Sequence, residues 1–250
     1  MPELREFEKT TSDKYEILRC LVGSQAYGLS VDTSDEDYKG IYISPKENVI
    51  GVLREEETRP IGPEDHSYSL RHFARLATKC VPNVLELLFC EEENIVHMSI
   101  DGYNLRLMRD AFLSKNCIQP YIGYAQGQLK KAAIVPTNRG LGRQEMVAEF
   151  GYDAKFAMHT IRLLESARDL LEKGTLIVRR PNREFLLDIR FGRAFKNYDD
   201  FRNFALDLIE NLRKIEDTTS LPEKPDMDFI NRKIIDLHER YWSRPKYAVP

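Results

Sequence analysis

The sequence predicts an α/β (α+β) protein in which a mixed sheet with flanking helices is followed by a helical C-terminal domain. The first observation is a set of three segments typical of strands, each apolar or alternating and bounded by turn residues: 15–22, 37–43 and 65–69. The second is that the apolar spacing after residue 103 is almost wholly that of helices. We therefore expect a first domain over residues 1–103 and a second over residues 104–250.

The boundaries of most elements follow from turn and cap residues. The first strand runs into Gly23-Ser24, where Ser24 is expected to cap a short helix that Gly28 ends. The second strand stops at Ser44-Pro45, and the charged segment 52–63 predicts an exposed loop or an edge hairpin. Further helices are expected at 70–78, from Pro82 onward, and at 104–113, 117–134, 144–172, 183–191, 198–217 and 227–242, with loops at 135–140 and 220–225.

The composition is that of an ordinary globular protein, with 42% hydrophobic residues, 31% charged residues and a formal net charge of −3. No apolar run reaches the about 18 residues that a membrane-spanning helix needs, so no membrane partner is expected. The charged start of the chain lacks the apolar core of a signal peptide. The cysteines are far apart and are expected to be reduced, which favours a cytoplasmic location: Cys20, Cys80, Cys90 and Cys117.

The most informative motif is Gly23-Ser24 followed by Asp35 and Asp37. A Gly-Ser turn after an apolar strand brings backbone N–H groups and a hydroxyl to phosphate oxygens. Carboxylates at positions i and i+2 of a strand point to the same face, where they can share a pair of divalent ions about 3.5–4 Å apart. The alternative for the acidic pair alone is a solvated turn. The ordered combination favours metal-assisted chemistry on a nucleoside triphosphate.

A third acid is expected to complete such a site, because two carboxylates rarely hold two dications well. Asp65 is the first candidate, since it opens the third strand. Glu86 is the second candidate, because it is a lone acid in an apolar stretch. For Asp65 the alternative is a plain cap at the start of the strand.

These residues resemble the DNA polymerase β nucleotidyltransferase superfamily, whose signature is hG[GS], a spacer and Dh[DE]h, where h is apolar. Glu36 and Tyr38 depart from the apolar positions of that signature. The longer motif, from Gly23 to Leu29 and from Ser34 to Ile41, is similar to the RlaP/YcgL-like branch, the RNA repair pathway DNA polymerase beta family. The resemblance covers about residues 14–195 and includes further segments: 82–89, 112–115, 123–125, 155–164, Arg179 and 189–192.

The resemblance implies a polymerase-beta-like nucleotidyltransferase fold, with a mixed sheet and flanking helices, and dependence on two Mg²⁺ ions, with Mn²⁺ as a substitute. It implies that Gly23 and Ser24 hold the triphosphate and that Asp35 and Asp37 hold the metal ions. Asp65 is carried over as the third metal ligand and catalytic acid.

A basic stripe on the long predicted helix is a second candidate for nucleotide binding. Lys155, His159 and Arg162 are spaced i, i+4 and i+7, so they share one helix face. Such a stripe can neutralise a leaving pyrophosphate. The alternative is a solvated face, paired with acids such as Glu165. Arginines between residues 179 and 193, with nearby tyrosines, are candidates for an acceptor groove, or else for surface charge and packing.

The predicted function is an Mg²⁺-dependent transfer of a nucleoside monophosphate from an NTP, with ATP expected, to a hydroxyl, with release of pyrophosphate. Three acceptors remain open: an RNA end, a small molecule, and a protein hydroxyl, as in AMPylation. An RNA end would place the enzyme in RNA repair or modification. The alternative is a non-catalytic nucleotide- or RNA-binding module on the same fold. The sequence does not indicate the oligomeric state.

Overall fold

The computed structural model describes residues 15–32, 34–62, 65–133 and 147–244. It confirms the predicted fold class, since a five-stranded mixed sheet is joined to helices and followed by a helical C-terminal region. The charged start of the chain, the predicted loop at 135–140 and the first residues of the predicted helix 144–172 lie outside the described residues.

The sheet has the strand order β3-β4-β2-β1-β5. Its central pair is antiparallel, and β4 runs parallel to β2, whereas both edge strands are antiparallel to their neighbours. The end of β1 therefore lies beside the starts of β2 and β4. The strands are β1 (Glu16–Val22), β2 (Asp37–Tyr42), β3 (Thr58–Pro60), β4 (His66–Ser69) and β5 (Ile95–Met98).

The three predicted strands are confirmed as β1, β2 and β4. The segment 52–63 was expected to be either an exposed loop or an edge hairpin, and the antiparallel pairing of β3 with β4 confirms the hairpin. Strand β5 was not predicted, because its four residues carry no clear alternation and half of them are exposed. The helix α1 (Gly23–Ala26) begins two residues earlier than expected, with Val22 at the N-cap position, so the predicted Ser24 cap is wrong. Gly28 follows its last turn with a φ of +68°, as a helix-ending glycine does.

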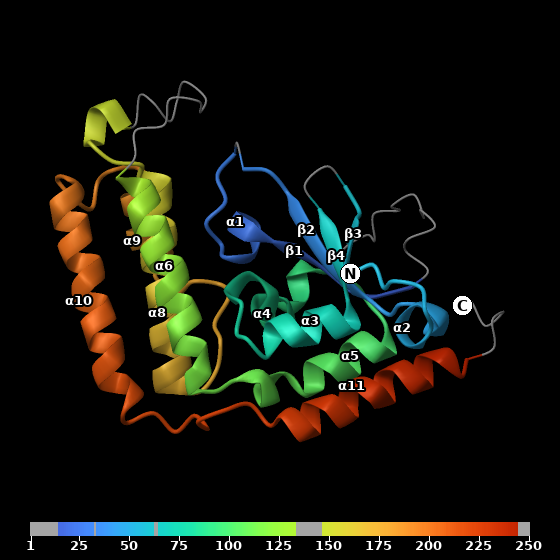
Figure 1. Ribbon diagram of the computed structural model, residues 1–250. Coiled ribbons are helices and arrows are strands. Elements are labelled where there is room, and N and C mark those ends of the chain that lie inside the picture. Colours follow the sequence, from blue (N-terminus) through green and yellow to red (C-terminus); the bar gives the residue numbers. More distant parts are fainter. Residues whose placement is uncertain (1–14, 33, 63–64, 134–146, 245–250) are drawn as a thin grey trace.

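A group of helices lies beneath the sheet in the view of Figure 1, and α11 runs along their lower side. In α3, Ser69 caps the first turn and the predicted apolar face is buried. In α4, Pro82 occupies the first turn and nearly every residue is buried. The helices are α2 (Lys46–Ile50), α3 (Leu70–Ala77), α4 (Pro82–Phe89), α5 (Ile100–Leu107) and α11 (Met227–Trp242).

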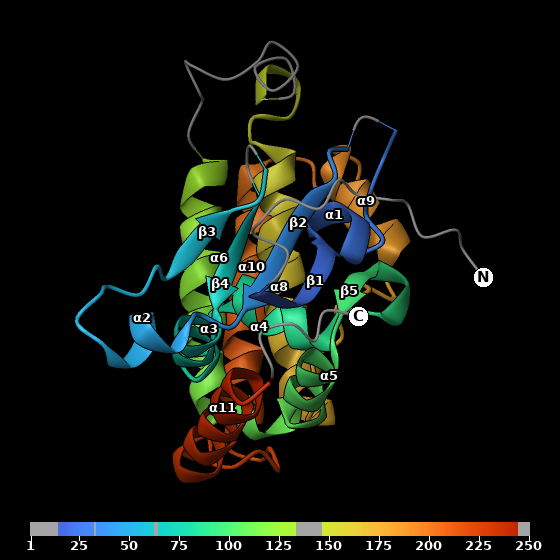
Figure 2. The ribbon, with the colours of Figure 1, turned by 90° about the vertical axis from the view of Figure 1, so that its right-hand side faces the viewer.

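The remaining long helices form a bundle beside the sheet (Figure 1), and the sheet lies in front of it in Figure 2. Helix α8 is central and packs against α6, α9 and α10. One continuous cluster of buried side chains extends from Ile17 to Leu237, so the sheet and the bundle share a core. The bundle helices are α6 (Ile118–Ala132), α8 (Ala154–Lys173), α9 (Arg183–Arg190) and α10 (Tyr198–Glu216). The division at residue 103 stays a prediction, and α5 spans that position.

The predicted helix 144–172 is interrupted before α8. Gly151 has a φ of +77°, and the Asp153 side chain accepts hydrogen bonds from the backbone N–H groups of Lys155 and Phe156. Asp153 is thus an N-cap that starts a new helix at Ala154. Lys155 therefore lies in the first turn of α8 rather than in the middle of a longer helix.

The expectation that every cysteine is reduced is wrong for one pair. A disulfide joins Cys80 to Cys117, 37 residues apart in sequence, whereas Cys20 and Cys90 are free and buried. The pairing arises because the turn between α3 and α4 packs against the start of α6, which spacing along the chain does not reveal. Among the described helices, none combines the length and apolarity needed to cross a membrane.

Candidate functional site

A cavity of about 270 Å³ lies where the end of β1 meets the starts of β2 and β4. Strands β1 and β2, the turn after β1, β4 and helix α4 all contribute to its wall. Its polar lining carries both signs of charge. The lining residues are Val22, Gly23, Tyr27, Asp37, Tyr38, Lys39, His66, Asn83 and Glu86.

Gly23 and Asp37 are in close contact at this cavity. Val22 pairs with Asp37 across β1 and β2, which brings the carboxylate of Asp37 against the turn that follows β1. Gly23 has a φ of +66°, and a Cβ atom there would lie 2.8 Å from Oδ2 of Asp37. Ser24 follows within α1 and does not line the cavity. The structure therefore joins the two halves of the predicted motif at Gly23 and Asp37.

The other two predicted acids lie around Asp37 without lining the cavity. Asp35 is exposed just before β2, at the position that shares a face with Asp37. Asp65 precedes β4, and its Oδ1 accepts a 2.7 Å hydrogen bond from the backbone N–H of Tyr38. Asp65 thus helps to fix the start of β2 against β4, and one of its oxygens is already engaged.

The donor atoms at this edge of the sheet fit a magnesium ion, because carboxylate oxygens are the ligands that Mg²⁺ prefers. Asp35 and Asp37 are the residues that would hold it. Within the described part of the chain, no group of three or more His, Cys, Asp or Glu side chains is close enough to form a complete metal site.

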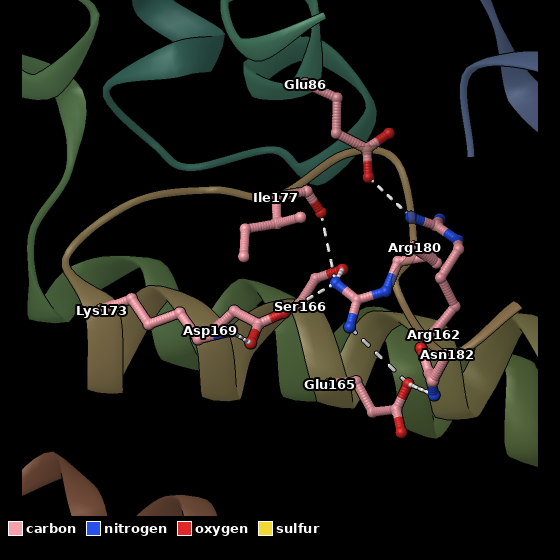
Figure 3. Close-up of polar contacts among 9 residues, drawn as sticks. All are labelled: Glu86, Arg162, Glu165, Ser166, Asp169, Lys173, Ile177, Arg180 and Asn182. Atoms are coloured by element: carbon pink, nitrogen blue, oxygen red, sulfur yellow. Dashed lines mark hydrogen bonds and ion pairs between the residues drawn. The ribbon is translucent and has the colours of Figure 1, made fainter. Parts of the chain in front are cut away.

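Glu86, the alternative third acid, lines the cavity but has two partners. Its Oε1 accepts a 2.7 Å hydrogen bond from Nη1 of Arg162, and its Oε2 accepts a 2.6 Å hydrogen bond from the hydroxyl of Tyr27. Figure 3 shows Glu86 facing Arg162 across the gap between their elements. The Arg162 guanidinium also lies over the Tyr27 ring, 3.7 Å from its centroid. All three residues are buried, and two of them, Tyr27 and Glu86, line the cavity, with Arg162 behind them.

The charges in this cluster are tightly coupled. Burial raises the pKa of Tyr27 far above its ordinary value, and Glu86 adds to the shift while Arg162 opposes it. Burial lowers the pKa of Arg162, but Tyr27 and Glu86 outweigh that effect and the net pKa is raised. The cluster therefore contains a neutral Tyr27 and a charged Arg162 at neutral pH.

The three members of the predicted basic stripe differ in exposure. Lys155 is exposed in the first turn of α8, and His159 is half-buried. Neither lines the cavity, whereas Arg162 donates a hydrogen bond to Glu86, a residue of its wall.

The predicted arginine groove includes residues that support the turn after β1. Arg183 donates to the carbonyl of Gly28 over 2.7 Å, and Arg190 donates to that of Leu29 over 3.0 Å. Arg180 is buried and donates 2.8 Å to Asp169, and Glu165 lies 3.7 Å from it (Figure 3). The backbone N–H of Arg180 also donates to the carbonyl of Tyr27. These contacts fix the position of the segment that follows Gly23.

Sequence reasoning assigned no role in the site to five of the polar lining residues: Tyr27, Tyr38, Lys39, His66 and Asn83. For Lys39 there was a signal, because it continues the i, i+2 series of Asp35 and Asp37 on β2. For His66 and Asn83 there was none, since their approach depends on the pairing of β2 with β4 and on the packing of α4.

Comparison with known proteins places these residues in context. A sequence profile of RlaP, described as the RNA repair pathway DNA polymerase beta family, matches residues 1–236, which include every residue of the cavity. The chain is also 28% identical over 131 residues to an uncharacterized 38.9 kDa protein from the nrdC-mobD intergenic region of Enterobacteria phage T4. That match covers 47% of this chain and 39% of the phage protein, less than half of each.

Proposed function

Since the chain belongs to the RNA repair pathway DNA polymerase beta family, we propose that it is a metal-dependent nucleotidyltransferase. It transfers a nucleoside monophosphate from an NTP, ATP first among them, to a hydroxyl group and releases pyrophosphate. The observation that carries the proposal is the contact between Gly23 and Asp37 at a cavity of about 270 Å³. It joins a turn suited to phosphate with a carboxylate suited to a metal ion.

Each part of the site has a role in this reaction. Gly23 and Ser24 bind the triphosphate through backbone N–H groups and the serine hydroxyl. Asp35 and Asp37 are the ligands for two Mg²⁺ ions, for which Mn²⁺ can substitute, and Asp65 is the third acid through its remaining oxygen. When bound, the metal ions supply neutralisation of the triphosphate and activation of the acceptor hydroxyl. The protein positions these groups and needs no covalent intermediate.

The acceptor that we favour is an RNA end, because the family is named for RNA repair. A protein hydroxyl, as in AMPylation, and a small molecule are the other acceptors to be tested. The reaction chemistry at the site is the same for all three, so the acceptor does not change the roles of Gly23 and Asp37.

The test is incubation of the full chain with labelled NTPs, Mg²⁺ and either RNA, protein or metabolite fractions. We expect label to enter the RNA fraction and pyrophosphate to appear, with both lost in EDTA and restored by Mg²⁺ or Mn²⁺. Asp35→Asn combined with Asp37→Asn should abolish transfer while the thermal unfolding midpoint is kept. Asp207→Asn, on an exposed position of α10, is the matched control and should retain full activity.

Two results would redirect the proposal. Label in the protein fraction alone would identify a protein-modifying enzyme. Tight NTP binding without pyrophosphate release for any acceptor would identify the non-catalytic binding module and reject catalysis.

A further inference from the structure

The charge of the cavity lining points to a residue that the proposed function has not used. Lys39 lies two residues after Asp37 on β2, so both side chains are on the face that lines the cavity. Lys39 is half-buried and, among the described residues that line the cavity, is the one lysine or arginine. A cation is therefore held directly beside the predicted metal-binding pair.

Of the two carboxylates that line the cavity with Lys39, Asp37 is a predicted metal ligand and Glu86 is already engaged. Both oxygens of Glu86 accept hydrogen bonds, one from Arg162 and one from Tyr27. Among the residues that the structure describes, the Lys39 side chain makes no hydrogen bond or ion pair. The ammonium thus has donor capacity at the cavity that is met by no acceptor among the described residues.

The other candidate cations are placed less well for a ligand in the cavity. Arg162 is buried and directed at Glu86 and Tyr27, which occupy its guanidinium. Lys155 is exposed at the start of α8 and does not contribute to the lining. An anion bound beside Gly23 and Asp37 shares the cavity with Lys39.

We propose that Lys39 binds the polyphosphate of the NTP and its pyrophosphate product in this cavity, in the role that the sequence pattern assigned to Lys155 and Arg162. This inference rests on the proposed function. Lysine suits the task because its ammonium is a compact point charge with three donors, which can follow phosphate oxygens as they move from substrate to leaving group. The ligand class recognised by Lys39 is therefore the polyphosphate and not the nucleoside.

The test is equilibrium binding of ATP, pyrophosphate and AMP, each with Mg²⁺, to the wild-type chain and to Lys39→Met. Loss of a charge-assisted contact should weaken ATP and pyrophosphate binding about ten- to hundredfold. AMP binding should be nearly unchanged, which a general disturbance of the fold would not produce. Lys39→Arg should retain most of the ATP affinity. Lys214→Met, on an exposed position of α10, is the control and should bind like the wild type.

The outcomes separate this inference from the proposed function. If the wild type binds no NTP, the proposed function fails and the inference fails with it. If the wild type binds ATP but Lys39→Met binds it equally well, or if Lys155→Met alone loses binding, only the assignment of Lys39 is overturned. An equal loss of ATP and AMP binding in Lys39→Met also overturns it. Should Lys39→Met unfold, Lys39→Gln gives the same comparison with a shorter polar side chain.

Discussion

Gly23 satisfies two requirements that no other residue type can satisfy together. Its φ of +66° lies in the left-handed region, and a Cβ atom would come within 2.8 Å of Oδ2 of Asp37. A side chain at this position would displace the carboxylate, because the carboxylate can rotate more easily than the backbone can move. Gly23 therefore sets the position of Asp37 as well as the shape of the turn.

Gly23→Ala should lower nucleotidyl transfer at least about tenfold, since a shift of one ångström at a reacting group has costs of this order or larger. It should also destabilise the fold by about 1–2 kcal/mol through backbone strain. Steady-state transfer rates and urea unfolding measure the two effects. The matched control is Gly174→Ala, because Gly174 has the same φ of +66° with no atom within 4 Å of the added Cβ. It should lose similar stability and no activity, and equal activity in both variants would contradict the role of Gly23.

His238 provides a residue-scale prediction about pH. It is buried in α11, and its Nδ1 lies 2.8 Å from the carbonyl of Ile234. Burial lowers its pKa below the ordinary value of about 6.5, and the bond to Ile234 offsets part of that shift. Below about pH 6.5 the His238 imidazole is protonated in the unfolded chain, whereas in the folded chain it binds a proton less readily. Stability contributed by neutral His238 is therefore present above about pH 6.5 and falls as the pH falls.

The check compares the free energy of unfolding of the wild type and of His238→Gln between about pH 8 and pH 5.5, a range that spans the ordinary histidine pKa. The wild type should lose more stability over this range than the variant, because other titrating groups are common to both proteins. Parallel pH dependences would show that His238 does not contribute.

At the scale of elements, the segment between α8 and α9 is held by a buried charge cluster. Arg180 donates to Asp169 and to the carbonyl of Ile177, and Glu165 receives a 2.7 Å hydrogen bond from Asn182 (Figure 3). The same segment pairs with the turn after β1 through the carbonyl of Tyr27. The position of that turn thus depends on a cluster that does not touch the cavity.

Arg180→Met should destabilise the fold by about 3–5 kcal/mol, because it removes the buried cation between Glu165 and Asp169 and leaves Asp169 with only the half-exposed Lys173 as a cationic partner. Arg179→Met is the matched control at the neighbouring position. Arg179 pairs with Glu93, and both side chains are more than half exposed, so its loss should cost less than about 1 kcal/mol. Urea unfolding of both variants measures the difference. Similar values for the two would mean that the buried cluster adds little stability.

The elements that could be predicted from sequence are those with local signals. Strand β1 and helix α3 follow from apolar periodicity and from the Ser69 cap. The break before α8 had such a signal in Gly151 and Asp153, but the continuous helical periodicity on both sides concealed it. The contact of Glu86 with Arg162 had none, since the residues are 76 positions apart and meet only when α4 packs against α8. The site could be predicted where its residues belong to one short sequence motif, from Gly23 to Asp37, and could not be predicted where it depends on the packing of distant helices.

At the scale of the whole molecule, Glu86 and Arg162 join its two parts. Glu86 belongs to α4, beneath the sheet, and Arg162 belongs to α8, in the bundle (Figure 1). Their ion pair is almost fully buried and includes Tyr27 from the turn after β1. The orientation of the bundle relative to the sheet is therefore coupled to the wall of the cavity.

A double-mutant cycle tests this coupling. Glu86→Gln or Arg162→Met alone should each destabilise the fold by about 3–5 kcal/mol, because each leaves a buried partner uncompensated. The double variant should be less destabilised than the sum of the single ones, since a buried ion pair replaced at both ends leaves no unpaired charge. Its ATP affinity should nevertheless stay below that of the wild type, because Tyr27 and the cavity wall lose their anchor. Additive losses of stability would show that the pair does not couple sheet and bundle, and wild-type ATP binding by the double variant would show that this coupling does not shape the cavity.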